Sequence, residues 1–462
     1  MKLKISSYAV VDTTDSVESE RPLVRPPGIL QWVFVLGLCV LLIFAVLAFG
    51  AVEKWSTFAF EAGAAVLFVV WAGKQLVSKQ AKLSKNPLYL PAFLFFGLIL
   101  AQVVLRRSAY GYVTEYEALK YVSYGIVLLI GAECIREEGA RKIFALVMIL
   151  FGAAYAFFAL AQELTANGKI FWVLSTQFPG SFYGSYVNHD HYAGLMEMLV
   201  PIPFVLSMGH LLRGGKRVLV GSCAVLMAGT IFLSGSRAGM LAFVLEMVLF
   251  AALTLGKRRS PRIALGSMAV CVFILALLIF IGKGQVLGRL GDLSPGIRLD
   301  ITKDSLRMFS KRPVWGWGLG TFPTVYPGYR SFYTNLFVNE AHNDYAQLVV
   351  ETGLLGFGLM LWFLVRLYRY GLPTSRRWEF QWDGAVSLAA LLGCTGILLH
   401  SFVDFNLQIP ANAALFYVLC GLAASRLLAE SSKPGRSRAI GNEGTGGGRT
   451  RSDNGDSLAR PT

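Results

Sequence analysis

A single arginine stands in a short motif of small residues between two apolar stretches of the sequence. The motif is Ser-Gly-Ser-Arg-Ala-Gly, residues 234–239, with Arg237 at its fourth position. Its small side chains would let an anionic headgroup approach the backbone N–H groups, while the guanidinium group of Arg237 binds the anion with two hydrogen bonds. An arginine that extends to the phosphates of surrounding lipids would give the same pattern. Both interpretations place Arg237 beside an anionic group.

A second polar region contains Arg298. Apolar residues at helical spacing predict a helix over 297–309, with Arg298 and Asp300 on different faces. The sequence Pro-Val-Trp-Gly-Trp-Gly-Leu-Gly, residues 313–320, then predicts an irregular turn. A helix in a solvated loop, with basic residues that serve no site, would have the same sequence pattern. Arg298 therefore becomes a candidate only in combination with other motifs.

The third polar motif begins with His342, Asn343 and Asp344 and continues into an apolar run that contains Glu351. At a membrane interface, the imidazole of His342 could contact both a lipid-linked headgroup and an acceptor in water, and it titrates near neutral pH. Glu351 falls two to three helical turns deeper, where an ionisable group is a candidate for function or ion pairing. A lone histidine is usually structural, so the motif depends on this combination of residues.

Further histidines and carboxylates occur near the same face. His189 and His191 flank Asp190, and His400 precedes Asp404 by four residues. A His-x-His pair beside carboxylates could bind a divalent metal. The spacing is loose, however, and histidines at an interface also contact lipid headgroups. We therefore expect no metal site.

The composition indicates the kind of element that must position these residues. Of 462 residues, 55% are hydrophobic and only 15% are charged, whereas a soluble domain has about 25% charged residues. We therefore expect an all-α, polytopic integral membrane protein with about 12 transmembrane helices of about 20 residues each. The apolar runs are Leu30–Phe49, Trp55–Val77, Leu88–Leu105, Tyr116–Gly131, Ile143–Gln162, Tyr192–Leu212, Val218–Leu233, Ala238–Leu255, Ile263–Ile281, Tyr345–Tyr370, Gly384–Leu399 and Ala411–Leu428.

Lys and Arg residues predict the orientation of these runs. They gather in alternate loops, over residues 74–85, 136–142, 213–217, 257–262 and 366–377. Because short basic loops stay in the cytoplasm, both termini are predicted to be cytoplasmic, and all three polar motifs fall on the outer face. The net charge of +15 then follows from topology and attraction to acidic membrane lipids, and it requires no nucleic-acid partner.

The chain divides into a membrane domain and two tails. Residues 1–27 are predicted to be a cytoplasmic N-terminal tail, residues 28–429 a transmembrane domain, and residues 430–462 a disordered cytoplasmic tail. Within the domain, residues 282–344 form one long outward loop, and ordered loops of this length usually serve a site. The six cysteines lie in or beside apolar runs and have neither disulfide nor metal-ligand spacing.

Together, the three motifs resemble those of the bacterial O-antigen ligase and O-antigen polymerase superfamily. The resemblance rests on the arginine motif around Arg237, on Arg298 followed by residues 313–320, and above all on residues 342–356. It covers roughly residues 181–412 at the level of motifs. Members are all-helical membrane glycosyltransferases of the GT-C type with a long periplasmic loop, which implies the same for residues 28–429.

The resemblance implies a lipid-diphosphate-dependent glycosyltransferase in the bacterial inner membrane, with its active site facing the periplasm. The donor would be a glycan on undecaprenyl diphosphate, and the acceptor hydroxyl would belong to lipid A-core, as in an O-antigen ligase. Arg237 and Arg298 would bind the diphosphate, and His342 would orient the acceptor hydroxyl or take its proton. We expect no cofactor and no metal, because two guanidinium groups can stabilise the leaving group. Supporting residues would be Asn343, Asp344 and Glu351.

Other functions remain open. Within the superfamily, a polymerase of O-antigen or exopolysaccharide and a protein O-oligosaccharyltransferase would share the donor and differ in the acceptor. Twelve spans also suit a secondary transporter or flippase, but the sequence lacks a clear internal repeat, and its longest polar loop is on the outside. A scaffolding component would need none of the arginines or histidines.

Overall fold

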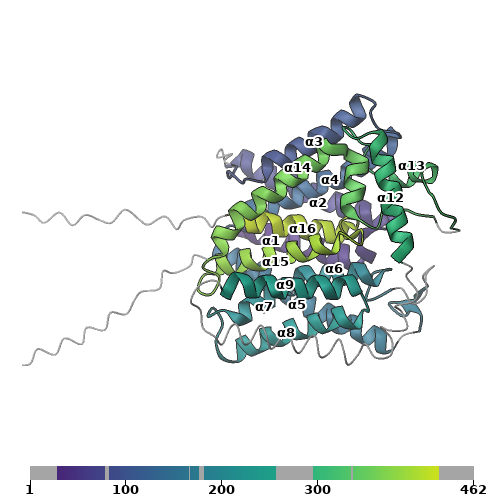
Figure 1. Ribbon diagram of the computed structural model, residues 1–462. Helices are drawn as coiled ribbons and strands as arrows, with labels where there is room; N and C mark the ends of the chain where they lie inside the picture. Colours follow the sequence, from purple (N-terminus) through teal and green to yellow (C-terminus); the bar gives the residue numbers. More distant parts are fainter. Residues whose placement is uncertain are drawn as a thin grey trace, which may run out of the picture. The chain divides into compact units, whose positions relative to one another are not determined.

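The computed structural model describes residues 29–78, 83–165, 167–175, 182–255, 295–334 and 337–425. Over these ranges the chain is mostly helical (Figure 1). A short hairpin pairs β1 (Lys169–Ile170) with the antiparallel β2 (Leu174–Ser175). The predicted tails over 1–27 and 430–462 and the predicted span over 263–281 lie outside the described residues.

Each predicted apolar run within the described residues coincides with a helix, and the sixth run is divided into two. The helices are α1 (Ile29–Leu47), α2 (Lys54–Val77), α3 (Tyr89–Val104), α4 (Gly111–Cys134), α5 (Glu138–Leu164), α6 (His189–Leu199), α7 (Pro201–Met208), α8 (Gly214–Leu233), α9 (Arg237–Leu255), α14 (Asp344–Ser375), α15 (Trp382–His400) and α16 (Pro410–Ala424). Pro201 begins α7 because its missing N–H group is tolerated only in the first turn of a helix.

Eight helical segments of the described chain are long and apolar enough to cross a membrane. Helices α3 and α16 are apolar but shorter, and α4 carries several charged residues in its first half. The protein is therefore a polytopic, mostly helical membrane protein. Within the described residues, eight segments have the length and composition of a span, which is fewer than the predicted total of about twelve. That total therefore stays a prediction.

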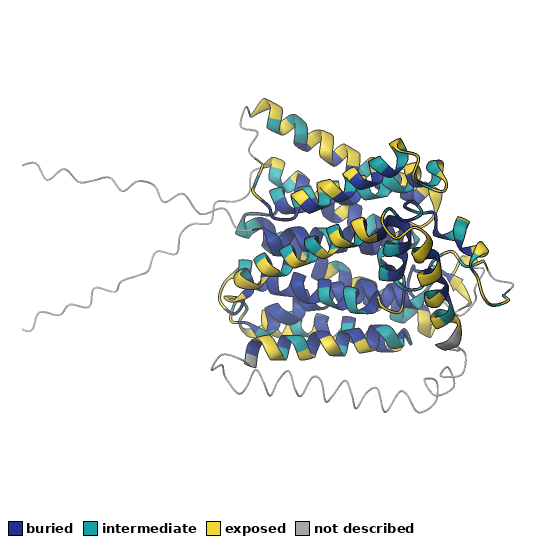
Figure 2. Cartoon of the chain, turned by 45° about the horizontal axis from the view of Figure 1, so that its top comes forward, coloured by how far each residue is buried: buried dark blue, intermediate teal, exposed yellow. Residues whose placement is uncertain are grey.

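Burial separates central helices from peripheral ones (Figure 2). Helices α6, α15 and α16 are buried along nearly their whole length. Peripheral helices instead expose large apolar side chains, such as Phe58, Phe93 and Phe157. Such side chains are favourable in lipid and unfavourable in water, so these faces are suited to the bilayer.

The described part of the long loop has a small core of its own. Helix α12 (Pro295–Lys311) confirms the helix predicted over 297–309, and the short α13 (Phe322–Val325) follows the Gly/Trp turn. Ile301, Met308 and Phe322 pack together with Val350 of α14. This packing holds α12 across the ends of the membrane helices, at the right of Figure 1.

Short 3-10 turns connect several helices. They are η1 (Phe49–Ala51), η2 (Tyr326–Gly328) and η3 (Asn406–Gln408). The turn η3 lies between α15 and α16, shortly after Asp404, which belongs to the site described below.

Candidate functional site

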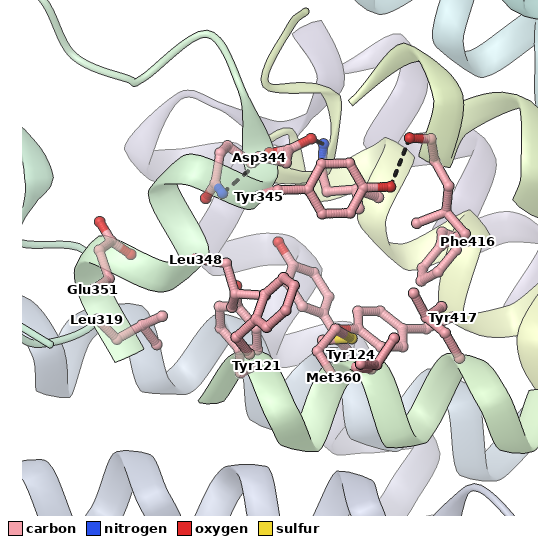
Figure 3. A pocket seen from close by; sticks show the side chains of 16 residues that line it. Tyr121, Tyr124, Leu319, Asp344, Tyr345, Leu348, Glu351, Met360, Phe416 and Tyr417 are labelled. Carbon is pink, nitrogen blue, oxygen red and sulfur yellow. Dashed lines mark hydrogen bonds between the residues drawn. The ribbon is translucent and has the colours of Figure 1, made fainter. Parts of the chain in front are cut away.

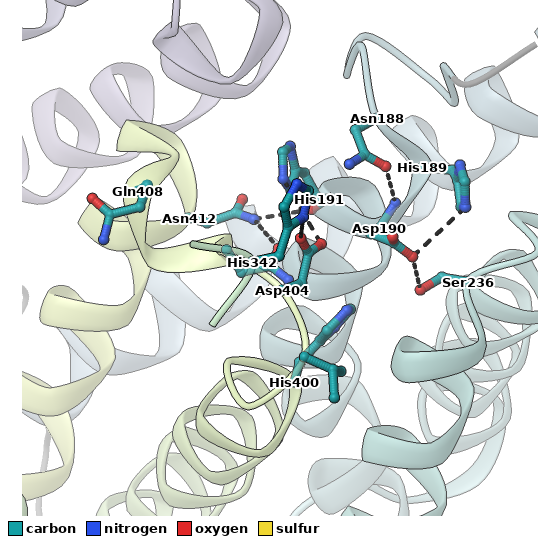
Figure 4. Close-up of polar contacts among 12 residues, drawn as sticks. Asn188, His189, Asp190, His191, Ser236, His342, His400, Asp404, Gln408 and Asn412 are labelled. Carbon is teal, nitrogen blue, oxygen red and sulfur yellow. Dashed lines mark hydrogen bonds and ion pairs between the residues drawn. The ribbon is translucent and has the colours of Figure 1, made fainter. Parts of the chain in front are cut away.

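The polar motifs converge at one end of the helices, where side chains from five segments meet. Figure 4 labels residues from all of these segments except α12. These segments are the start of α6, the turn between α8 and α9, the start of α12, the residues before α14, and the turn between α15 and α16. We call the group formed by Asp190, His191, Glu197, Arg298, His342, His400 and Asp404 the polar cluster.

Asp404 occupies the centre of the polar cluster. Its side chain is fully buried, and its two carboxylate oxygens face the Nδ1 atom of His342 at 3.6 Å and the Nε2 atom of His191 at 3.8 Å. Both distances exceed those of a hydrogen bond. Burial alone would raise the pKa of Asp404, but the surrounding imidazole and guanidinium groups lower it below its ordinary value. The Asp404 carboxyl is therefore ionised.

His342 has an unusual backbone conformation for a residue with a side chain. Its φ angle is +51°, in the left-handed region that costs an ordinary residue about 1 kcal/mol or more. The imidazole packs edge-on against Phe405, with ring centroids 4.9 Å apart. About a third of the side chain stays exposed. The strained backbone thus directs one ring nitrogen to Asp404 and leaves the ring accessible.

Asp190 joins the first two motifs. The Ser236 hydroxyl donates a hydrogen bond of 2.6 Å to Asp190 Oδ1, and Arg298 Nη2 lies 3.5 Å from Asp190 Oδ2. Arg298 also donates from Nη1 to the Val403 carbonyl oxygen at 2.7 Å. Asp190 lies in the first turn of α6, whose N-cap is the side chain of Asn188. These bonds tie α12 and the α8–α9 turn to α6.

Arg237 is the first residue of α9, next to Ser236. It is partly buried, and within the described ranges its guanidinium group has neither a hydrogen bond nor an ion pair. The turn fits closely against α6, because a Cβ atom on Gly239 would lie 2.6 Å from the Cβ atom of Ala193. Arg237 therefore follows directly on the residue that bonds Asp190, at the start of a turn held close to α6.

His400 and Glu197 form a buried pair beneath Asp404. The Nδ1 atom of His400, on α15, lies 2.8 Å from Glu197 Oε1, on α6, and both side chains are fully buried. The Nε2 atom of His400 is buried and has no hydrogen-bond partner among the described residues.

Glu351 takes part in a different region, the loop junction, which we define as residues 313–322 packed against residues 350–354. Glu351 Oε1 accepts a hydrogen bond of 3.2 Å from the backbone N–H of Phe322. A Cβ atom on Gly316 would lie 2.4 Å from the Glu351 carbonyl, and one on Gly353 would lie 2.2 Å from the Val314 oxygen. Both glycines have positive φ angles, and Gly353 kinks α14. The Gly/Trp motif and Glu351 thus fasten the loop to α14.

The other two predicted supporting residues also make structural contacts. The Asn343 side chain caps α14 by accepting hydrogen bonds from the N–H groups of Tyr345 and Ala346. Asp344 accepts hydrogen bonds from the Ser401 hydroxyl at 2.7 Å and from the Leu407 N–H at 3.1 Å. Both residues therefore fix the segment that carries His342 relative to the turn that carries Asp404.

An apolar cavity of about 100 Å³ adjoins this region (Figure 3). It lies between α4, α14 and α16 and is lined by aromatic side chains such as Tyr121, Tyr124 and Tyr417. Asp344 and Glu351 are also among its lining residues. The cavity therefore connects apolar helix faces with the polar residues at the start of α14.

The sequence analysis missed part of this arrangement. It proposed Arg298 and His342, which the structure brings into the polar cluster, and Glu351, whose contacts are in the loop junction. It noted Asp190, His400 and Asp404 only as a loose metal-ligand pattern near the same face, and it did not name Glu197. Glu197 did carry a signal, because an acidic residue inside an apolar run of span length is a candidate for function.

Comparison with known protein families gives one match. Residues 222–361 match the model of a family described as O-antigen ligase. The matched segment contains Arg237, Arg298 and His342, and it ends before His400 and Asp404. A search of curated proteins finds no match to this chain.

Proposed function

We propose that this chain, which belongs to the O-antigen ligase-like superfamily of glycosyl-transferring enzymes, transfers a glycan from undecaprenyl diphosphate to an acceptor hydroxyl at the periplasmic face of the inner membrane. The observation that carries this proposal is the convergence of Arg298 and His342 around the buried carboxylates Asp190 and Asp404, with Ser236, the neighbour of Arg237 in the sequence, hydrogen-bonded to Asp190. Three motifs that are distant in the sequence thus form one site at the end of apolar helices.

The arginines are suited to the leaving group. A guanidinium group stays charged and can donate two parallel hydrogen bonds to phosphate oxygens. Arg237 has no competing partner among the described residues, and Arg298 uses only part of its donor set on Asp190 and Val403. As the bond to the anomeric carbon breaks, negative charge grows on the diphosphate oxygen, and cations already in position stabilise it.

His342 is suited to activate the acceptor. With Nδ1 directed to Asp404, its Nε2 atom would take the proton of the acceptor hydroxyl. The acceptor oxygen then bonds to the anomeric carbon, the bond from that carbon to the diphosphate oxygen breaks with its electron pair, and undecaprenyl diphosphate leaves. Attack from the opposite side inverts the anomeric configuration. Asp404 acts as a positioning residue, because it orients the imidazole and stabilises its positive charge.

The acceptor distinguishes the members of this superfamily. We propose lipid A-core, as for an O-antigen ligase, with a GT-C-type fold, both termini in the cytoplasm and membrane lipids around the domain. A polymerase would use a second lipid-linked glycan, and a protein oligosaccharyltransferase would use a protein hydroxyl. The apolar cavity beside Asp344 does not distinguish among these acceptors.

The test is transfer by the purified protein in detergent, with one defined glycan on undecaprenyl diphosphate and each acceptor in turn. We expect product with lipid A-core, and a loss of at least about 100-fold in Arg237→Ala and in Arg298→Ala. Arg330→Ala, an exposed arginine of the same loop, is the matched control and should keep wild-type turnover. Wild-type rates in both arginine variants would refute the role assigned to the arginines. A wild-type protein that forms no product with any acceptor would refute the activity.

A further inference from the structure

We propose that a cleft at the start of α8, which we call the basic cleft, binds the phosphate headgroup of an anionic phospholipid. The cleft has a volume of about 460 Å³ and lies where the connection from α7 to α8 meets the connection from α14 to α15. Ligand sites in proteins commonly have volumes of about 300–1,000 Å³. The residues that line the cleft are His210, Leu212, Arg213, Gly214, Arg217 and Phe380.

The basic cleft is distant from the polar cluster. Helix α8 begins at the cleft, and its 20 residues measure about 30 Å, which is the thickness of the hydrocarbon core of a bilayer. Helix α15 begins two residues after Phe380 and ends at His400 of the polar cluster. The cleft therefore lies at the opposite end of the membrane helices, and this inference does not rest on the proposed function.

Arg217 is held in a fixed orientation within the cleft. Its Nε atom donates a hydrogen bond of 2.6 Å to the carbonyl oxygen of Ser207, which joins the first turn of α8 to the end of α7. Among the described residues, its two Nη atoms donate no hydrogen bond and its side chain forms no ion pair. A guanidinium group held in this way can donate from both Nη atoms to phosphate oxygens.

Two further cations lie around the same turn without compensating anions. Arg213 lines the cleft, and Lys216 directly precedes Arg217. Both side chains are exposed, and neither forms an ion pair within the described residues. No acidic side chain of the described chain lines the cleft, and Glu379, which directly precedes Phe380, is buried. A phosphate group would therefore meet three positive charges that have no acidic partner.

The backbone at the start of α8 adds to this attraction. Gly214 and Gly215 begin the helix, and no side chain caps its first turn, whose N–H groups need acceptors. A Cβ atom added to either glycine would meet nothing within 4 Å. The first turn is therefore open to a ligand, and the helix dipole favours an anion there.

The apolar surroundings favour a lipid over a free phosphate ion. Val218 and Leu219 follow directly on Arg217, and their side chains are 69% and 66% exposed. In the lining of the cleft, the ring of His210 stacks on that of Phe380, with the centroids 5.1 Å apart. Exposed apolar side chains next to a basic cleft would contact acyl chains, and basic pockets between membrane helices bind phospholipid headgroups. A soluble phosphate would use the cations alone.

Native mass spectrometry tests the site by counting lipids on the protein. The full-length protein is delipidated in detergent and titrated with phosphatidylglycerol, which is anionic, or with phosphatidylcholine, which has no net charge. We expect one saturable phosphatidylglycerol site. Arg213→Ala and Arg217→Ala should each weaken binding about fivefold, and the double variant at least about tenfold. Arg369→Ala, an exposed arginine in the last part of α14, is the matched control and should bind like the wild type.

The control decides whether the cleft is a specific site. Equal affinity of Arg369→Ala and the double variant for phosphatidylglycerol would show an effect of general surface charge and overturn the site. Equal affinity of the wild type for the two lipids would also overturn it. Thermal unfolding identifies variants that fold. Arg213 has no hydrogen bond from its side chain within the described residues, so Arg213→Ala should fold, and it decides if the double variant fails.

Competition distinguishes a lipid from a free anion. Inorganic phosphate and glycerol phosphate carry the same charged group without acyl chains. We expect neither of them to displace the bound phosphatidylglycerol when added in molar excess. Complete displacement by either compound would overturn the assignment of a lipid and identify a free phosphate as the ligand. Glycan transfer does not enter these measurements, so failure of the lipid site and failure of the proposed function are distinguishable.

Discussion

The polar cluster and the loop junction each contain a buried carboxylate, but the two carboxylates have opposite surroundings. Glu351 accepts a hydrogen bond from the Phe322 N–H in the loop junction, and Gln347 lies 3.5 Å from the same oxygen. Asp404 faces imidazoles and has no hydrogen bond within the described residues. A carboxylate with backbone partners stabilises a particular chain conformation, whereas unpartnered groups that face one another leave binding capacity for a ligand. The difference teaches that burial of an acidic residue does not by itself identify a functional site.

The most direct test of this comparison makes the same chemical change in both regions. Asp404→Asn should reduce glycan transfer by about 100-fold or more, because the amide cannot stabilise a protonated His342. The free energy of unfolding should change by less than about 1 kcal/mol, since no hydrogen bond is lost. Glu351→Gln should keep most of the transfer rate, because the amide oxygen still accepts from Phe322. Initial rates and thermal unfolding of both variants provide the measurement. A larger loss of rate in Glu351→Gln than in Asp404→Asn would reverse the roles we assign.

A second test adds one methyl group to the loop junction. Gly353→Ala should lower the free energy of unfolding by about 2–3 kcal/mol, because Gly353 has a φ angle of +64° and its added Cβ atom would meet the Val314 oxygen. The transfer rate per folded molecule should stay near that of the wild type. Gly358→Ala is the matched control on the same helix, where an added Cβ atom meets nothing within 4 Å. Equal unfolding midpoints for the two variants would contradict the close contact between loop and helix.

The smallest effect is expected from the same substitution beside the polar cluster. Gly239→Ala should push the turn that carries Arg237 away from α6, because the new Cβ atom would lie 2.6 Å from that of Ala193. Since small displacements of binding groups lower rates more than stability, we expect about a tenfold loss of transfer. Gly229→Ala on α8, with open space around the added Cβ atom, is the control. Rates that match between these two variants would show that the position of the turn is not critical.

Local patterns predicted most of the helices. Runs of apolar residues predicted the helices, because the length of such a run indicates whether a helix can span the bilayer, and its side chains favour the hydrocarbon environment. The spacing of Ile297 and Ile301 likewise predicted α12, which the structure confirms. The motifs around Arg237, Arg298 and His342 were visible for the same reason, since each is a short run of polar residues beside an apolar one.

Pairing across the fold was decided by the tertiary structure alone. The sequence separates Glu197 from His400 by 203 residues, and Ser236 from Asp190 by 46. No local periodicity encodes which buried polar group meets which, because partners depend on how whole helices pack. The same packing gave Glu351 a backbone partner and left Asp404 without a hydrogen bond among the described residues. The sequence thus determined where polar groups enter the apolar helices, and the packing of those helices determined which of them remain free to bind a ligand.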